Sequence, residues 1–188
     1  MITQGEFEEK VKEFGTLADF RDEIEGWCSE LIGKNQELEG LCFMLFTWNF
    51  ANMRRMLKTF SIKKFKEVLR EINPIFAKLK KEKFEIADFD KLKDDVGFIY
   101  SKLLPLVQQT GTTKLMYFKN PNLFVMWDTK IRSKWKIKKV DSESYLAFLK
   151  LMQKEFFHIK WDNKSISLAR AIDMYNYAVT QKVKDRKE

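Results

Sequence analysis

The chain has little cysteine, histidine, proline or glycine. Two cysteines, Cys28 and Cys42, are too few for a four-cysteine iron–sulfur cluster, and with one histidine, His158, they argue against a structural zinc site. A secreted protein of this size usually carries more cysteine, so we expect two reduced thiols. Three prolines and seven glycines leave few breaks, which favours long helices.

The sequence also lacks a basic N-terminal leader and a long apolar run. Its first residues are acidic where a secretory signal needs cations. The longest apolar stretch, residues 41–48, is too short to cross a bilayer. We therefore expect a soluble, cytoplasmic protein with no membrane partner, no metal and no organic cofactor.

Charge is divided unevenly along the chain. Residues 1–40 carry 4 basic and 11 acidic side chains, whereas residues 41–188 carry 31 basic and 16 acidic ones, giving net charges of −7 and +15. Such a division favours a surface that binds a polyanion, and DNA is the partner we expect. The alternative is that 28 lysines against 7 arginines reflect only lysine-rich usage.

Hydrophobic residues make up 45% of the chain and aromatic residues 14%, enough for one packed core. Apolar side chains recur at helical spacing, and capping residues precede several of these segments. The helices expected on this basis cover residues 19–33, 36–59, 61–81, 88–103, 112–119, 142–156 and 165–183. No pair of strands is evident. We predict a single all-α domain over 1–183, with acidic N-terminal helices in 1–40, functional segments in 100–140 and a frayed tail at 184–188.

A glycine turn is predicted between the helix ending near Val107 and the helix starting near Thr112. Gly111 tolerates a positive φ, and the amides of Gly111, Thr112 and Thr113 would then be unpaired at a helix start. Such amides bind phosphate, and a monovalent cation can join them. The alternative is an ordinary interhelical turn.

Asp128 follows the apolar run 125–127, so its carboxylate is expected at the mouth of a cleft. A fixed carboxylate there can stabilise developing positive charge or activate water. The structural alternative is that Asp128 caps the helix starting at Thr129.

These two segments together resemble a known family. Gly111-Thr-Thr-Lys114-Leu followed by Leu123-Phe-Val-Met-Trp-Asp128-Thr-Lys-Ile-Arg132 is similar to the core of the helix-hairpin-helix DNA glycosylase superfamily. The family pattern apolar–Asp–Thr–His–Val–x–Arg is matched at Asp128, Thr129, Ile131 and Arg132, with Lys130 in place of histidine. The resemblance implies a compact helical fold with a helix-hairpin-helix element and a catalytic role for Asp128, whose carboxylate would stabilise an oxocarbenium-like sugar or activate water. It also implies a flipped base, on which Trp127 or Trp48 could stack.

The chain departs from that family in three further respects. Its hairpin has one glycine, and the position of the lysine that attacks the sugar in lyase-active members falls on Thr113, one residue before Lys114. We name Lys114 as the candidate nucleophile on resemblance alone. The family's four-cysteine cluster loop is absent.

A basic run follows Asp128. Residues 130–139 hold six cations and no acid, and Lys130, Arg132, Lys134 and Lys136 are expected to widen the grip on DNA. A solvated helix face is the alternative. The prediction is a DNA-binding protein that excises a damaged or mismatched base; the alternative is a non-enzymatic helical module that binds nucleic acid or an acidic protein. The sequence leaves open whether chemistry takes place.

Two polar residues in apolar surroundings complete the candidates. Asp173 is expected to make a surface or interhelix hydrogen bond. Asn49 is expected either to satisfy a buried partner or to face the pocket.

Overall fold

The structure, a computed structural model, describes residues 2–17 and 19–181. Within them it contains helices and no strand, which confirms the all-α prediction. The helices are α1 (Gln4–Leu17), α2 (Asp19–Gly33), α3 (Glu37–Thr47), α4 (Phe50–Met56), α5 (Ile62–Leu79), α6 (Lys93–Lys119), α7 (Thr129–Lys134), α8 (Ser142–Phe156) and α9 (Leu168–Gln181). The tail expected at 184–188 lies outside the described residues.

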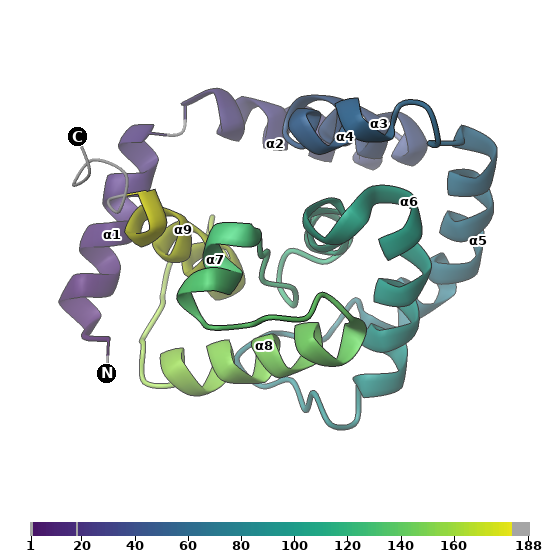
Figure 1. Cartoon of the computed structure of the whole chain (residues 1–188). Helices are drawn as coiled ribbons and strands as arrows, with labels where there is room; N and C mark the ends of the chain where they lie inside the picture. The colour runs from purple at the N-terminus through teal and green to yellow at the C-terminus, as the bar shows by residue number, and fades with distance from the viewer. Residues whose placement is uncertain (1, 18, 182–188) are drawn as a thin grey trace.

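The N-terminal helices form an arc around the C-terminal ones (Figure 1). α1 lies at one end of the arc, α2, α3 and α4 cross the top, and α5 closes the far side. α6 and α7 lie inside this arc, and α8 runs beneath them. α2 packs on α3, α1 on α9, and α6 on both α5 and α8, so helices distant in sequence share one core.

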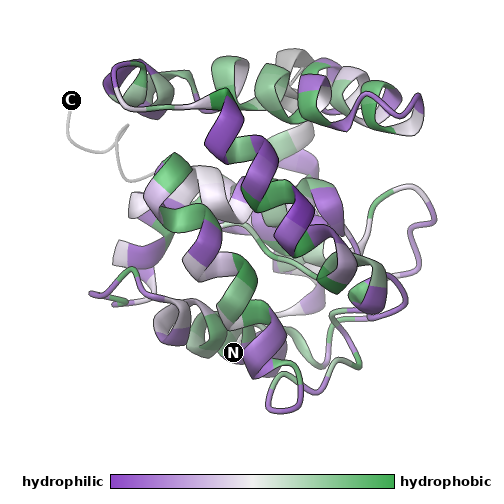
Figure 2. Ribbon diagram, turned by 90° about the vertical axis from the view of Figure 1, so that its right-hand side faces the viewer, coloured by the Kyte–Doolittle hydropathy of each residue, from purple (hydrophilic) through white to green (hydrophobic). Residues whose placement is uncertain are grey.

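The core follows from helical periodicity. In α5 the buried side chains are Phe65, Leu69, Ile72, Phe76 and Leu79, which recur three or four residues apart and share one face. The hydroxyl of Ser61 accepts from the Lys64 amide at 3.3 Å, as a capping residue should. Figure 2 shows the resulting division, with hydrophobic and hydrophilic segments alternating around the ribbons.

The helix predicted over 36–59 is broken in the structure. α3 ends at Thr47, and α4 begins after Asn49, whose backbone has φ −111° and ψ 20°. The Thr47 hydroxyl donates to the Phe43 carbonyl at 2.6 Å, a bond that competes with the helical ladder. The interruption turns Trp48 and Asn49 toward the candidate site instead of leaving them inside a buried helix.

The helix predicted from Asp88 begins later, at Lys93. The Asp88 carboxylate accepts from the amides of Asp90 and Lys91, both at 3.2 Å, and so closes a local turn before the helix. Helix α8 covers the predicted residues 142–156. Helix α9 starts at Leu168, three residues after its predicted start.

The turn predicted at Gly111 lies instead at Gln108. Gln108 has φ 56° and ψ 176°, which divides α6 into two helical segments, 93–107 and 109–119. No described glycine has a positive φ. Gly111 lies inside the second segment, where a Cβ would come within 2.9 Å of Asn49 Nδ2 and 3.0 Å of Val107 Cβ. Glycine is therefore required at 111 for close packing, and the prediction of a glycine turn was wrong.

None of the helices in the described residues has the length and apolar composition needed to cross a membrane. Cys28 is buried and Cys42 is half-buried, and both are free thiols.

Candidate functional site

The segment that leads to Asp128 runs through the centre of the protein. Residues 123–127 are buried and have no regular secondary structure. Buried backbone groups outside a helix need side-chain partners. The Tyr145 hydroxyl donates to the Val125 carbonyl at 2.9 Å, and Thr113 Oγ1 accepts from the Trp127 amide at 3.3 Å. These bonds hold the chain rigidly up to Asp128.

Asp128 caps α7, as the structural alternative predicted. Its Oδ1 accepts from the Ile131 amide at 2.8 Å, and its backbone is extended. The half-buried carboxylate also lies where two hollows meet. We call these hollows the inner cavity and the outer cleft.

The inner cavity has a volume of about 190 Å³. It is lined by Phe14, Trp48, Thr110, Lys114, Met126, Trp127, Asp128, Ile131, Asp173 and Tyr177. Its walls are mainly hydrophobic and include four aromatic residues, while two carboxylates and one amine supply its charged groups. The volume lies below the roughly 300–1,000 Å³ of sites for drug-sized ligands, so the cavity suits a single heterocyclic base better than a whole nucleotide.

The outer cleft has a volume of about 410 Å³ and is lined by Trp48, Asn49, Ala51, Asn52, Arg55, Gln108, Gln109, Thr110, Lys114, Asp128, Thr129 and Lys130. Three cations lie along it, on α4, α6 and α7. The side-chain amide nitrogen of Asn49 is buried against Gly111 and makes no hydrogen bond within the described residues.

Lys114 lines both hollows, but its amine is engaged. Nζ donates to the Trp48 carbonyl at 2.7 Å and lies 5.0 Å from the centroid of the Trp48 ring. The amine is therefore held at the wall that the two hollows share.

Trp48 is the aromatic residue common to both hollows. Besides Lys114, the Arg170 guanidinium lies 5.3 Å from the centroid of its ring. The contacts make Trp48 an anchor for two cations, and its stacking on a base stays a prediction.

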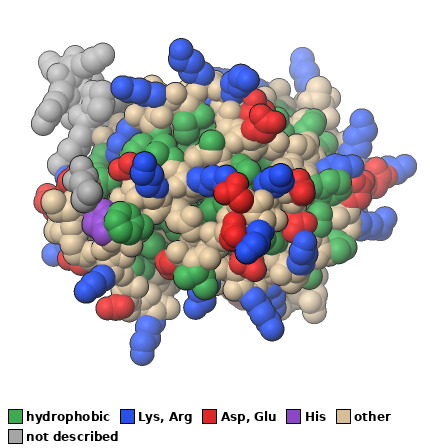
Figure 3. Space-filling view, turned by 90° about the horizontal axis from the view of Figure 1, so that it is seen from below, with side chains coloured by type: hydrophobic (Ala, Val, Ile, Leu, Met, Phe, Trp, Pro, Cys, Tyr) green, Lys and Arg blue, Asp and Glu red, His purple; other side chains and the backbone are tan. Residues whose placement is uncertain are grey.

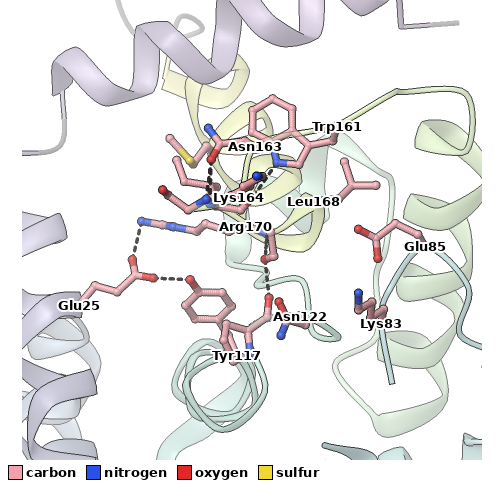
Figure 4. Close-up of a pocket in the computed structure, with 15 residues that line it drawn as sticks. Glu25, Lys83, Glu85, Tyr117, Asn122, Trp161, Asn163, Lys164, Leu168 and Arg170 are labelled. Atoms are coloured by element: carbon pink, nitrogen blue, oxygen red, sulfur yellow. Dashed lines mark hydrogen bonds and ion pairs between the residues drawn. The ribbon is translucent and has the colours of Figure 1, made fainter. Parts of the chain in front are cut away.

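A charged network lies behind the inner cavity. Arg170 bridges Asp173, at 2.7 Å, and Glu25, at 2.9 Å. The other oxygen of Glu25 accepts from the Tyr117 hydroxyl, as Figure 4 shows. Burial raises the pKa of the Asp173 carboxyl to about 6, although Arg170 opposes this shift. Burial likewise raises the pKa of Tyr117 well above its ordinary value.

Arg170 and Glu25 also line a third hollow, a polar cleft of about 600 Å³. Trp161 and Asn163 border it above Arg170, with Lys83 and Glu85 on the opposite side (Figure 4). The Trp161 indole donates to the Ile166 carbonyl at 2.7 Å and thereby fixes the loop that leads into α9. The buried arginine thus separates this cleft from the inner cavity.

The residues predicted for phosphate binding lie near the start of the second segment of α6, and they are buried. The Thr112 hydroxyl donates to the Gln108 carbonyl at 2.8 Å, and Thr113 supports Trp127. Because this segment starts at residue 109, Gly111 lies in its first turn, where amides have no partner within the helix. Phosphate binding by these amides stays a prediction. Residues 108–110 occupy the start and face the outer cleft. The monovalent cation expected there stays a prediction.

The four cations of the basic run that were predicted to bind DNA lie in different surroundings. Lys130 lines the outer cleft. Arg132 is buried; its guanidinium donates to the carbonyls of Ile137 and Lys138 at 3.4 and 3.5 Å, so it holds the chain after α7. The role of Arg132 as an exposed DNA contact was therefore wrong.

The other two cations of the run differ from each other. The Lys134 amine lies 4.6 Å from the centroid of the Tyr175 ring, and partial desolvation lowers its pKa to about 8. Lys136 is exposed and has φ 57°, the left-handed conformation that ends α7. The amide of Ile137 then donates back to the Arg132 carbonyl at 2.9 Å, as in a Schellman motif.

Trp127 cannot stack on a base in this conformation. Its side chain has no exposed surface, and its ring packs against those of Tyr145 and Phe148 at centroid distances of 5.1 and 5.4 Å. The prediction of Trp127 as a stacking residue was wrong, because the apolar run ends inside the core.

Charges of both signs mix on the lower face of the protein. Lys and Arg side chains project around its edge, and acidic side chains lie among them near the centre (Figure 3). The charge division along the sequence therefore does not give this face a single sign.

Two residues of the site carried a weak sequence signal. Arg170 and Asp173 are three apart in an apolar helix and so share a face, yet nothing local indicates that they border Asp128. Nothing in the sequence indicated that Gln108 would adopt a positive φ.

No protein-family model, curated protein or solved structure matches the chain. Among the residues placed by the structure, no group of three or more His, Cys, Asp or Glu side chains could hold a metal ion.

Proposed function

We propose that this protein binds duplex DNA at the outer cleft and hydrolyses the bond between a damaged or mismatched base and its deoxyribose. One observation carries the proposal: the Asp128 carboxylate lies where the inner cavity and the outer cleft meet. A base placed in the inner cavity would leave its sugar beside Asp128 and its phosphates in the cleft. Enzymes that act on a base in a duplex have to extrude it in this way.

The outer cleft provides the contacts to the DNA backbone. Arg55, Lys114 and Lys130 place positive charge along it. Cations that neutralise phosphates release counterions, so affinity is expected to fall as salt rises. This contact carries no sequence information, which suits a protein that scans DNA for altered bases.

Asp128 supplies the chemistry. When the bond to the base breaks, positive charge develops on the sugar, and a fixed carboxylate beside it lowers the barrier. The hydrogen bond from the Ile131 amide holds the carboxylate in place, so it needs no reorganisation during the reaction. Water can then attack the sugar and lose its proton to Asp128.

Strand cleavage through Lys114 is not part of the proposal. An amine must be deprotonated and close to the sugar to attack it, and this amine is bonded to the Trp48 carbonyl. The expected product is an intact strand with an abasic site.

The test uses the purified protein and a panel of duplexes that carry single damaged or mismatched bases. Heating in alkali converts abasic sites into strand breaks, and omission of this step reports lyase activity. Wild-type protein is expected to give alkali-dependent breaks with at least one duplex. Asp128→Asn is expected to abolish them while DNA binding persists, because asparagine caps a helix as well as aspartate does.

Asp141→Asn is the matched control. Asp141 caps α8 and accepts from the Ser144 amide at 2.8 Å, the same arrangement as in Asp128, but it lines neither hollow. It is expected to act like wild type. Equal losses in both variants would show that the loss of a carboxylate at a helix start, rather than of a catalytic group, explains the effect of Asp128→Asn.

A second candidate is a non-enzymatic module that binds nucleic acid on this scaffold. It is favoured by the capping bond of Asp128 and the engaged amine of Lys114, each of which gives the residue a structural role. It predicts salt-dependent binding with no product from any duplex. Under both candidates, Arg55→Ala and Lys130→Ala should each reduce the salt slope by about one, whereas Lys154→Ala on α8 should not.

A further inference from the structure

Asp173 brings a second carboxylate to the inner cavity. It projects from α9, whereas Asp128 stands at the start of α7, and both line the same hollow. Asp173 is only 7% exposed. Arg170 donates to its Oδ2 at 2.7 Å. This bond holds the carboxyl in place at the wall of the cavity.

The charges around Asp173 come from four elements. Arg170 on its own helix and Lys114 on α6 favour the ionised form, while Asp128 and Glu25, from the start of α7 and from α2, disfavour it. Burial is the strongest influence, and the net effect raises the pKa to about 6. A carboxyl in that range holds a proton part of the time near neutral pH and can give it up, which is what a general acid requires.

We propose that Asp173 is the catalytic acid that protonates the departing base, so that the preferred substrates are uncharged bases whose departure needs a proton. This inference rests on the proposed function. A neutral base is a poor leaving group because it would depart as an anion. Protonation of a ring nitrogen or exocyclic oxygen removes that obstacle.

The step balances as follows. The Asp173 carboxyl gives its proton to the base, the bond between C1′ and the base nitrogen breaks, and the electron pair leaves with the base. The Asp128 carboxylate faces the positive charge on the sugar. Water adds to C1′ and passes a proton to Asp128. Exchange with solvent returns a proton to Asp173 and removes one from Asp128, and the net reaction consumes one water.

The positions of the two carboxylates assign stabilisation of the sugar to Asp128 and protonation of the base to Asp173. Asp128 borders the outer cleft and is reached by an amide donor, so it lies on the sugar side. Asp173 lines the inner cavity and does not line the outer cleft, so it lies on the base side. Two carboxyl groups in different surroundings are the usual arrangement for glycosidic bond cleavage.

The test compares two substrates under single-turnover conditions. One is the best uncharged base found in the panel, and the other is 7-methylguanine, whose positive charge lets it leave without protonation. Asp173→Asn is expected to slow excision of the uncharged base by about 10²–10⁴-fold, the usual contribution of a general acid, and to leave excision of 7-methylguanine near the wild-type rate. Asp162→Asn, an exposed carboxylate that lines no hollow, is the control.

The pH dependence of the excision rate of the wild-type protein is a second, independent test that needs no variant. Excision of the uncharged base should decline as pH rises through about 6, where Asp173 loses its proton, while excision of 7-methylguanine should not show this decline. Wild-type activity on 7-methylguanine alone, or equal slowing of both substrates by Asp173→Asn, would overturn the role of Asp173 and leave the proposed function standing. No product from any duplex would overturn both.

Discussion

Replacing Gln108 by glycine is expected to make the protein more stable. Gln108 has φ 56° and ψ 176°, close to a conformation that glycine alone adopts readily. Holding a residue with a Cβ there costs about 1–3 kcal/mol. Glycine also increases the conformational freedom of the unfolded chain, which reduces the gain in stability by about 0.4–1 kcal/mol. The expected net gain in the free energy of unfolding is therefore about 1 kcal/mol.

Thermal unfolding followed by far-ultraviolet circular dichroism measures this gain. For a chain of this size, about 1 kcal/mol should raise Tm by roughly 2–4 °C. Gln109→Gly is the matched control, because Gln109 is the first residue of the second helical segment of α6, where glycine relieves no strain and lowers stability by up to about 0.5–1 kcal/mol. A fall in Tm of similar size for both variants would show that Gln108 is not strained and would refute the reasoning.

Gly111→Ala is the converse of this experiment. The added Cβ would lie 2.9 Å from Asn49 Nδ2 and 3.0 Å from Val107 Cβ, and such overpacking costs about 1–3 kcal/mol. Because alanine has a higher helix propensity than glycine, it stabilises the helix by about 1 kcal/mol. The expected net loss in the free energy of unfolding is therefore up to about 2 kcal/mol. Asn49→Ala should remove part of that loss in the double variant. Stabilisation by Gly111→Ala alone would contradict the packing.

Three further outcomes are expected. Trp127→Ala should cost about 3–5 kcal/mol in urea unfolding, because the ring is fully buried; a cost below about 1 kcal/mol would contradict that burial. The Asp173 carboxyl has its pKa raised in the folded state from 3.8 to about 6, so wild-type stability relative to Asp173→Asn should be highest below about pH 4 and should fall as pH rises through about 6. A pH-independent difference would exclude this linkage. Desolvation lowers the pKa of Lys134 to about 8, so at pH 8 an acylating reagent followed by peptide mass spectrometry should modify Lys134 faster than Lys136; equal rates would count against the shift.

Much of the helical framework was predictable. The segments 61–79 and 142–156 have apolar residues at helical spacing and a capping residue before them, and the structure has helices there. The cap formed by Asp128 was also predictable, since it depends on an amide only three residues away. The break after Thr47 was not, because apolar residues continue through it and no proline or glycine marks it.

The turn in α6 shows why composition misleads at a single position. Glycine is the usual residue for a positive φ, so Gly111 was the natural choice. The structure places the strain on Gln108 because Gly111 is needed where α6 meets Asn49 and Leu45. A contact between helices decided between two neighbouring positions, and local preference could not.

By itself, the sequence determined that the chain forms helices, where several of them begin, and that an aspartate caps the helix in which the basic run starts. These features depend on residues within a turn or two of each other. Only the tertiary structure decided that Trp127 is enclosed, that Arg132 supports the backbone, and that Asp173 shares a cavity with Asp128. Those outcomes depend on how α6, α7 and α9 pack together, and side chains brought near one another by packing leave no periodic mark in the sequence.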